Sequence, residues 1–277
     1  MKKYTYSSVL TIAGFDGSGG AGIQADIKTI SALGCYATSV LTALPVQNTQ
    51  GVKNIFPISV DAVAEQLESI LNDIFPDAIK IGMVHTPELV DVIVRTLASY
   101  KKIPIVFDPV MVATSGHRLI EEKTIDTIID KLFPISEIIT PNMDEAAILA
   151  KMEVKTLEDM KIAGQRIRAL GCKNILLKGG HLETETISSL WYTDKNKFKT
   201  YESLKIQTQN THGSGCTLSS AIASFIARGE SLDEAVMLAQ NYVSEAIYHG
   251  HDVEIGKGNG PLNHFFNPQK LTKNELV

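Results

Sequence analysis

The chain has 277 residues, of which 44% are hydrophobic, and its formal net charge is -5. This length allows one large α/β domain or two small ones, and the composition excludes a disordered or collagen-like chain. The negative charge and the scattered Lys and Arg residues exclude a general electrostatic affinity for nucleic acid, and no apolar run is long enough to span a membrane.

The three cysteines, Cys35, Cys172 and Cys216, are far apart and form no C-x-x-C pair. This spacing disfavours a disulfide framework or a structural zinc site and is typical of a reducing compartment. A short apolar stretch near the amino terminus runs into Asp16 and glycines instead of an A-x-A-like cleavage site, which disfavours a signal peptide. We therefore expect a cytoplasmic protein.

Short apolar segments alternate with amphipathic segments along most of the chain. The apolar segments are rich in Val and Ile, end at Gly, Pro, Asp or Asn, and predict buried strands at residues 8–14, 37–46, 78–83, 104–111, 137–142 and 174–180. Apolar residues at helical spacing predict helices at residues 60–75, 86–100, 121–132 and 157–171. Thr86 with Pro87 favours a helix start, and Gly171 a helix stop.

Residues 187–203 interrupt this alternation. Two short strand-like runs joined by polar residues predict a hairpin added to the sheet, and a pair of helices follows at residues 216–229 and 231–250. Alternating strands and helices predict a mostly parallel sheet with helices on both faces. Because the sequence contains no linker, repeat or low-complexity segment, residues 1–277 are expected to form a single domain.

Polar side chains occur at the carboxyl ends of several predicted strands. These residues are Asp16, Lys80, Asp108, Asn142 and Lys178. Packing of a parallel sheet does not require polar residues there, and ligands of such sheets bind outside the carboxyl ends of the strands. The sequence therefore predicts a ligand site at this edge.

The segment "GSGGAG", Gly17 to Gly22, matches the G-x-G-x-x-G spacing of dinucleotide-binding turns. That fingerprint also requires a carboxylate about twenty residues further on, but the chain has no Asp or Glu between Asp26 and Asp61. A nucleotide-binding dehydrogenase is therefore disfavoured. A tight strand-to-helix turn and the lip of a small-molecule site are the other two interpretations.

The segment "NTHGSGCT", Asn210 to Thr217, leads into a predicted helix, and the chain contains no Walker-type phosphate loop. Backbone N–H groups of Gly213, Ser214 and Gly215 at a helix start favour an anion such as a phosphate. Cys216 in the first turn is expected to have a stabilised thiolate and a lowered pKa. A Ser/Gly helix start with a small buried cysteine explains the local sequence equally well.

The segment "TPNMDE" also has two interpretations. Asn142 and Glu145 have the spacing of a capping box, which stabilises a helix start without any function. The same pair offers two hard oxygen groups on one turn, which suits a hydrated Mg²⁺ ion with few protein ligands. The local sequence favours the cap.

Several motifs together resemble one family. They are "LTIAGFDGSGGAGIQADIKT", "QNTQGV", "DPVM", "TPNMDE", "KGGH", "THGSGCT" and "GPLNHFF", which cover nearly the whole chain. In this order they resemble the hydroxymethylpyrimidine/phosphomethylpyrimidine kinases of thiamine biosynthesis, within the ribokinase-like superfamily. The combination is specific, although each motif alone is weak. The resemblance implies a three-layer α/β/α sandwich around a central, mostly parallel sheet, and a homodimer.

The resemblance also implies an activity and a set of site residues. The activity is ATP- and Mg²⁺-dependent phosphorylation of 4-amino-5-hydroxymethyl-2-methylpyrimidine and then of its monophosphate. The implied pyrimidine site consists of Gly14, Ala21, Asp26, Gln47, Met83 and Val110. Asn142 and Glu145 would hold the Mg²⁺-phosphate assembly, with Asp108 supporting them, and Lys178 would meet the nucleotide phosphates. Gly213, Ser214 and Gly215 would form an anion hole, with Cys216 facing the substrate hydroxyl as the proton acceptor.

The sequence departs from the family pattern at three places. Phe15 replaces a small polar residue, Pro45-Val46 replaces a small pair before Gln47, and Ser214 stands where threonine is commoner. The first two affect the expected substrate preference and not the reaction type. A pyridoxal kinase of the same branch is the nearest alternative function, and a non-catalytic sensor with the same fold is a more distant one.

Overall fold

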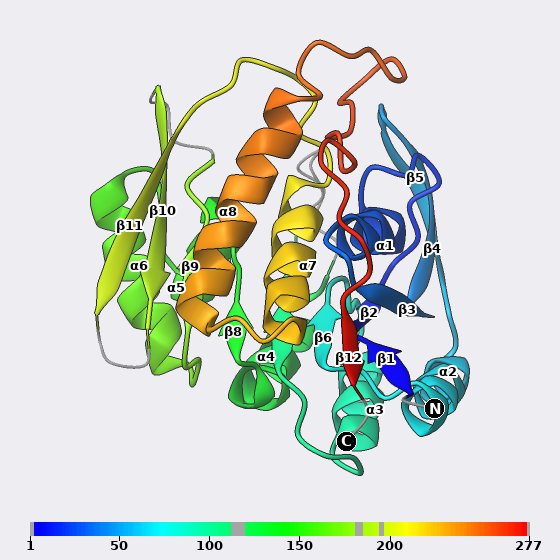
Figure 1. Cartoon of the computed structure of the whole chain (residues 1–277). Helices are drawn as coiled ribbons and strands as arrows, with labels where there is room; N and C mark the ends of the chain where they lie inside the picture. The colour runs from blue at the N-terminus through cyan, green and yellow to red at the C-terminus, as the bar shows by residue number, and fades with distance from the viewer. Residues whose placement is uncertain (1–2, 112–119, 181–184, 194–196, 276–277) are drawn as a thin grey trace.

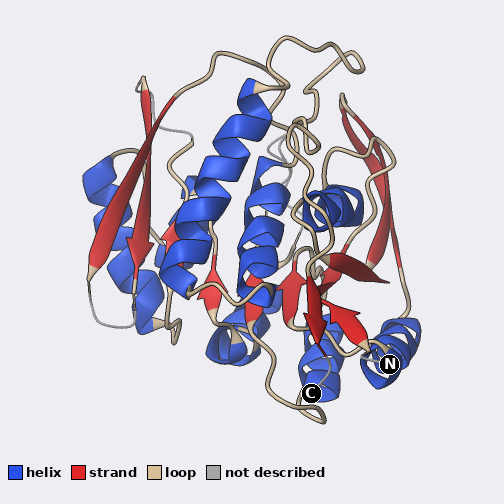
Figure 2. Cartoon of the chain, in the orientation of Figure 1, coloured by secondary structure: helices blue, strands red, loops and turns tan. Residues whose placement is uncertain are grey.

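The computed structural model describes residues 3–111, 120–180, 185–193 and 197–275. An eight-stranded sheet with the order β11-β10-β9-β8-β7-β6-β2-β3 runs through this part of the chain (Figures 1 and 2). Its strands are β2 (Ser8–Ala13), β3 (Tyr36–Leu41), β6 (Ala78–Ile81), β7 (Ile105–Phe107), β8 (Ile138–Ile139), β9 (Ile175–Leu177), β10 (Thr186–Tyr192) and β11 (Phe198–Leu204). The six strands from β9 to β3 pair in parallel, whereas β10 and β11 form the antiparallel hairpin expected at residues 187–203.

Helices cover both faces of the sheet and complete the predicted three-layer α/β/α sandwich. One face packs against α2 (Val60–Asp73), α3 (Pro87–Leu97), α4 (Glu122–Lys131), α5 (Met143–Ala150) and α6 (Leu157–Ala169). The other face packs against α1 (Gly22–Ala32), α7 (Ser214–Ala227) and α8 (Leu232–Tyr248). A short 3-10 turn (Phe133–Ile135) follows α4. None of the described helices has both the length and the apolar character needed to cross a membrane.

Alternation along the central strands divides the core into these two layers. In β6, Ile79 and Ile81 belong to the core beside α2 and α3, whereas Ala78 belongs to the core beside α1 and α7. Successive side chains of a strand point to opposite faces, so Lys80 is directed toward α1 and α7. A fully buried lysine on a central strand is the one departure from apolar packing in this strand.

Capping contacts confirm two of the predicted helix starts. The Thr86 side chain accepts the Leu89 N–H at the start of α3, where Pro87 is the first helical residue. Asn142 and Glu145 form a reciprocal capping box at the start of α5, with distances of 2.9 and 2.7 Å. Such caps satisfy N–H groups that have no partner within the helix.

The expectation of one buried strand at residues 37–46 is wrong. The chain leaves the sheet after β3, and β4 (Ala43–Asn48) pairs with β5 (Gly51–Pro57) in a separate antiparallel hairpin. In β4 the burial alternates: Ala43 and Pro45 are buried, whereas Leu44 and Val46 are exposed. The apolar run concealed this break because alternation with exposed apolar residues cannot be distinguished from a continuous buried strand by composition.

A second small sheet joins the two ends of the described chain. Strand β1 (Tyr4–Tyr6) pairs antiparallel with β12 (Lys273–Glu275), so both termini lie together near the amino ends of the central strands (Figure 1). The glycine-rich turns lie at the opposite, carboxyl edge of the sheet. The termini are therefore remote from the edge at which a ligand site is predicted.

The two glycine-rich turns at the carboxyl edge are in direct contact. Gly213, the N-cap of α7, has a φ of 82°, and a Cβ atom on it would lie 1.7 Å from the carbonyl oxygen of Gly20. A Cβ on Gly20 would in turn lie 2.5 Å from the ring of His212. Both turns therefore depend on the absence of side chains for their close approach.

We predict that Gly213→Ala destabilises the protein far more than Gly229→Ala. Both glycines have positive φ, which costs a side-chain-bearing residue about 1–2 kcal/mol, but Gly229 has open space where the Cβ would lie. The clash with Gly20 should add about 1–3 kcal/mol to the loss at Gly213. Urea unfolding measures both free energies, and equal losses in the two variants would contradict the close packing of the turns.

Candidate active site

A cavity of about 420 Å³ opens at the carboxyl edge of the sheet, within the size range of small-molecule sites. Nearly all of the residues predicted from the sequence line it. They are Gly14, Ala21, Gln47, Met83, Val110, Asp108, Asn142, Glu145, Lys178, Gly213, Ser214, Gly215 and Cys216. These residues come from segments far apart in the chain, and the parallel sheet brings them to one place.

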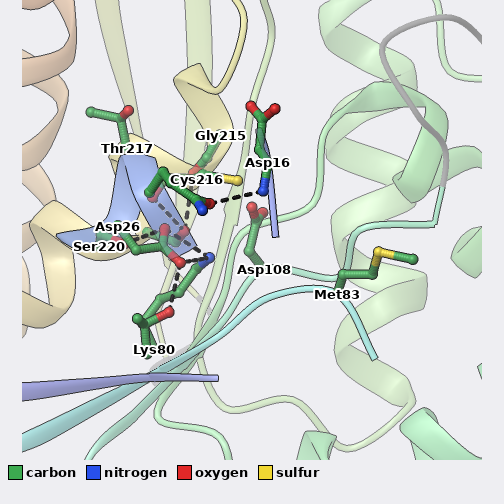
Figure 3. Close-up of polar contacts among 12 residues, drawn as sticks. Asp16, Asp26, Lys80, Met83, Asp108, Gly215, Cys216, Thr217 and Ser220 are labelled. Atoms are coloured by element: carbon green, nitrogen blue, oxygen red, sulfur yellow. Dashed lines mark hydrogen bonds and ion pairs between the residues drawn. The ribbon is translucent and has the colours of Figure 1, made fainter. Parts of the chain in front are cut away.

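Asp26, also expected at the substrate site, is not among the residues that line this cavity. It is 0% exposed and lies beneath the cavity, on the side of the sheet that faces α1. Its carboxylate binds the ammonium of Lys80 and the hydroxyls of Thr11 and Ser220 (Figure 3). A group saturated in this way has no bonding capacity left for a ligand.

The turn at residues 17–22 binds the carboxylate of the preceding residue, Asp16. The fully buried carboxylate of Asp16 accepts the N–H groups of Ser18, Gly20 and Ala21 at 2.7–3.1 Å, together with the Ser18 hydroxyl. Burial opposes ionisation of Asp16, but these bonds and the contact with His212 outweigh it and hold its pKa well below the usual range. Because three amides of this turn already bind Asp16, they are not available for a pyrophosphate, which argues against a dinucleotide site.

The first turn of α7 is an open anion site. Ser214 N–H bonds to the Thr211 carbonyl, whereas the N–H groups of Gly215 and Cys216 have no partner among the described residues. A Cβ on Gly215 would lie 3.1 Å from Lys178 Nζ and 3.5 Å from Asp108 Oδ2, so this glycine allows the helix start to approach both side chains. Free N–H groups and a nearby ammonium together favour an anion at this end of the cavity.

Lys178 is held by two carboxylates. Its Nζ lies 2.8 Å from Asp108 Oδ1, which also accepts the Thr140 hydroxyl at 2.9 Å. Burial disfavours the ammonium, but the negative charges of Asp108 and Glu145 outweigh burial and raise the pKa of Lys178. Lys178 is therefore positively charged at neutral pH and faces the start of α7.

Glu145 is 2% exposed, and burial together with the negative charge of Asp108 outweighs the attraction of Lys178, raising its pKa to about 7. With both carboxylates ionised, this cluster carries two negative charges and only one ammonium. The cluster is therefore poised to gain a proton or a cation near neutral pH.

The expected lowered pKa of Cys216 is wrong. Burial raises the pKa of this thiol to about 11, although the ammonium of Lys80 and a hydrogen bond from the Gly22 N–H oppose the shift. The side chain is half-buried and borders the cavity beside Asp108 (Figure 3). Cys216 is therefore in its thiol form at neutral pH, ready to face a ligand but not ionised at rest.

The β4-β5 hairpin forms the opposite wall of the cavity. Side chains of β4 alternate between its two faces, so Val46 is exposed outside whereas Gln47 lines the cavity, and the register of the hairpin shifts between these two residues. The Gln47 amide has no side-chain hydrogen bond to any described residue. Of the sequence departures, Phe15, Pro45 and Ser214 line the cavity, but Val46 does not.

Sequence reasoning missed the segment that fastens this hairpin. The Thr49 hydroxyl accepts the N–H groups of Lys257 and Gly258, and its carbonyl accepts the N–H of Asn259 at 2.9 Å. Asn259 also lines the cavity. The glycines at residues 256–260 indicated a turn that could approach other backbone closely. Nothing in the local sequence indicated that this turn contacts residue 49, more than two hundred positions earlier.

Solved structures with this fold are kinases of small molecules. A phosphomethylpyrimidine kinase of Clostridium difficile is 44% identical, with a TM-score of 0.75 over 87% of this chain and 99% of its own. A pyridoxal kinase of Staphylococcus aureus in complex with AMP-PCP and pyridoxal is 32% identical, with a TM-score of 0.86 over 98% of this chain and all of its own. The fold is that of the ribokinase-like small-molecule kinases.

The family model described as phosphomethylpyrimidine kinase matches residues 16–263, and the chain belongs to this family. The hydroxymethylpyrimidine/phosphomethylpyrimidine kinase of Salmonella typhimurium is 42% identical over 93% of this chain and 97% of its own length. The thiamine biosynthesis bifunctional protein ThiED of Geobacter sulfurreducens is also 42% identical over 93% of this chain. The chain spans about half, 52%, of the length of that bifunctional relative.

We predict that the free energy of unfolding of the wild type declines as pH rises, and that Glu145→Gln removes this decline. In the folded protein Glu145 keeps its proton up to about pH 7, whereas the unfolded chain loses it near the ordinary value of 4.5. Between these values the folded state binds more protons, so the free energy of unfolding falls as pH rises. Gln imitates the protonated form at every pH, and the wild type should lose up to about 3 kcal/mol relative to this variant across the window.

Urea unfolding of both proteins at about pH 5 and about pH 8, without added metal, measures this difference. Comparison of the two proteins cancels the contributions of the other titrating groups. Parallel pH profiles would show that the folded state does not raise the pKa of Glu145.

Proposed function

We propose that this protein phosphorylates 4-amino-5-hydroxymethyl-2-methylpyrimidine, and then its monophosphate, with ATP in thiamine biosynthesis. One observation carries this proposal. A single cavity has a positively charged site for an anion at one end, formed by Lys178 and the start of α7, and the amide of Gln47 on the opposite wall. The first end suits a transferred phosphoryl group and the second a polar heterocycle. Membership of the phosphomethylpyrimidine kinase family supports the same assignment.

The phosphates of ATP would lie at the anion end. Lys178 provides a charge held by Asp108, and the free N–H groups of Gly215 and Cys216 provide two donors on a fixed backbone. Phosphoryl transfer depends mainly on positioning and on neutralising charge on the transferred group. A site preorganised in this way stabilises that charge without rearranging during the reaction.

The residues at this end also fit Mg²⁺. When both are ionised, Asp108 and Glu145 carry one negative charge more than Lys178 compensates, and carboxylate oxygens are ligands that Mg²⁺ prefers. No group of three or more His, Cys, Asp or Glu side chains among the described residues is arranged to hold a metal by itself, which agrees with an ion that relies on phosphates and water. Asn142 and Glu145 would hold the ion, Asp108 would support them, and the bound ion would neutralise phosphate charge.

Cys216 would face the substrate hydroxyl and accept its proton. The resting thiol is neutral, because its pKa lies near 11, so only a small fraction is ionised at neutral pH. A loose transition state for phosphoryl transfer makes little demand on the nucleophile before bond formation. A weakly ionised base is therefore compatible with turnover, and turnover should rise with the ionised fraction.

Pyridoxal is the second candidate substrate. The similarity to the Staphylococcus aureus pyridoxal kinase, with a TM-score of 0.86, favours it. Both compounds present a hydroxymethyl group on a planar heterocycle. Gln47 favours the aminopyrimidine, because its unpaired amide offers an acceptor and two donors to an adjacent amino group and ring nitrogen.

The proposal includes a cytoplasmic homodimer. Support for a dimer comes from the outer face of the β4-β5 hairpin, where Leu44, Val46 and Phe56 are 39–53% exposed and Leu44 pairs with Phe56 across the strands. Contiguous exposed apolar side chains favour association with another surface. Light scattering that gives the mass of one chain at micromolar concentration would contradict the dimer.

We predict that Cys216→Ala lowers kcat by about 10²-fold or more, as loss of a general base does, with little change in the affinity for ATP. In the wild type, kcat should also rise with pH above neutrality, because the ionised fraction of a thiol with a pKa near 11 increases there. The alanine variant should lack this rise. A near-normal kcat in the variant would remove Cys216 from the chemistry.

We also predict a substrate preference that depends on Gln47. ADP release with the pyrimidine alcohol, its monophosphate, pyridoxal and ribose should give a kcat/KM for the aminopyrimidine about tenfold or more above that for pyridoxal, since each neutral hydrogen bond contributes roughly 0.5–1.5 kcal/mol. Gln47→Met should narrow this gap by weakening the pyrimidine alone. Preference for pyridoxal in the wild type, or equal weakening of both substrates, would assign the protein to vitamin B6 phosphorylation instead.

A further inference from the structure

A buried ion pair lies beneath the cavity, in the core between the sheet and helices α1 and α7. Lys80 Nζ is 3.0 and 2.8 Å from the two carboxylate oxygens of Asp26, and both side chains are 0% exposed. Asp26 also accepts the hydroxyls of Thr11 at 2.6 Å and Ser220 at 2.7 Å. The pair therefore links strands β2 and β6 to both helices.

Fold stability alone does not explain this pair. Removing two charges from water costs several kcal/mol per ion, and well-packed apolar residues of similar size often stabilise a core as well or better. Neighbouring positions in the same layer are apolar, including Val9, Ala78 and Val106. Gly82 also accommodates the lysine, because a Cβ there would lie 2.7 Å from Lys80 Nζ. The ammonium therefore fits a space formed by residues of β2, β6, α1 and α7.

That place lies directly beneath the proposed reaction centre. Lys80 and Cys216 both line the cavity, and Figure 3 shows the lysine ammonium beside Asp26 and below Cys216. The charged groups that face Cys216 are Lys80 on β6, Asp26 on α1, Asp108 after β7 and Lys178 after β9. Of these, Lys80 attracts a negative charge on the sulfur more strongly than Asp26 or Asp108 repels it.

The orientation of the pair explains this balance. An ion pair acts on a nearby group as a dipole, and the end that lies nearer determines the sign of the effect. Lys80 is among the residues that line the cavity and Asp26 is not, so the ammonium lies on the cavity side of the pair. The hydroxyls of Thr11 and Ser220 hold the carboxylate of Asp26 in place. Because Lys80 is fully buried, it has no surface with which to contact a substrate, and any effect on the reaction must act through another group.

We infer that Lys80 is a positioning residue for Cys216: held by Asp26, its ammonium fixes a positive charge beneath the sulfur and stabilises the thiolate. Ionisation releases the thiol proton to solvent, and the thiolate then accepts the proton of the substrate hydroxyl. This role rests on the proposed function, in which Cys216 is the proton acceptor. The thiolate itself can be measured in the protein alone, without substrate or turnover.

The experiment is alkylation of Cys216 by iodoacetamide at about pH 8, followed by peptide mass spectrometry. Only the thiolate reacts, so the rate reports the ionised fraction, and mass spectrometry separates Cys216 from the buried Cys35 and Cys172. Lys80→Met should slow alkylation by about tenfold or more, because loss of the positive charge that acts most strongly on the sulfur should raise the pKa of the thiol by roughly one unit or more. Lys199→Met, which breaks an exposed ion pair on β11, is the matched control and should leave the rate unchanged.

A second variant keeps the test decisive if Lys80→Met leaves Asp26 unpaired and the protein unfolds. In Lys80→Met with Asp26→Asn, both charges are absent and the Asn oxygen can still accept the Thr11 and Ser220 hydroxyls. Its rate should fall between those of the wild type and of Lys80→Met. If Lys80 had a purely structural role, the alkylation rate of the variants would rise above that of the wild type, because looser packing would expose the sulfur.

Slower alkylation in the folded double variant supports the inference, and an equal or faster rate overturns it. Failure of the proposed function would appear separately, as absence of ADP release in the wild type, and would leave the alkylation result intact. If the function holds, kcat in the double variant should fall at neutral pH while the KM for ATP remains near the wild-type value. A raised KM with unchanged kcat would assign Lys80 to folding of the nucleotide site instead.

Discussion

The carboxylate of Asp16 holds the site together. It is fully buried, binds three amides of the first glycine-rich turn, and contacts His212 of the second turn at 2.9 Å. A buried carboxylate remains ionised only when donors surround it, so the chain must bring both turns to this point when it folds. The contact between Gly213 and Gly20 then aligns the start of α7 with the strand ends. The anion end of the cavity depends on that alignment.

Charge is distributed unevenly along the cavity floor. Two ammonium groups, Lys178 and Lys80, lie near the start of α7, and each is tied to a carboxylate that fixes its position. Both lysines line the cavity, but Lys178 is partly exposed and can meet an anion, whereas Lys80 is 0% exposed. A low-dielectric environment strengthens both charges, and the surrounding bonds prevent them from rearranging. This arrangement suits a reaction in which negative charge moves between oxygen atoms and changes little in amount.

The wall of the cavity that carries Gln47 is formed by a segment outside the central sheet. The β4-β5 hairpin is separate from the central sheet and is fastened to the carboxyl-terminal residues through Thr49. The anion end is therefore built into the core, whereas the wall that carries Gln47 is an attachment. Relatives with this fold include both pyrimidine and pyridoxal kinases. Changes in an attached hairpin alter the shape of a cavity without disturbing the core, which offers a physical route to such diversity.

The sequence by itself determined the layered fold, the helix caps at Thr86 and Asn142, the added hairpin, and the polar cavity residues at the strand ends and at the start of α7; the other cavity residues came only from the motif resemblance. These features follow from local periodicity, capping chemistry and the rule that parallel strands end at one edge. Motif resemblance supplied the family, which spacing alone left open. Tertiary structure decided that Asp26 lies below the site, that residues 37–46 leave the sheet, and that Cys216 is neutral at rest. These three outcomes depend on burial and on contacts with segments far away in the chain. The few residues on either side of each position do not encode such contacts.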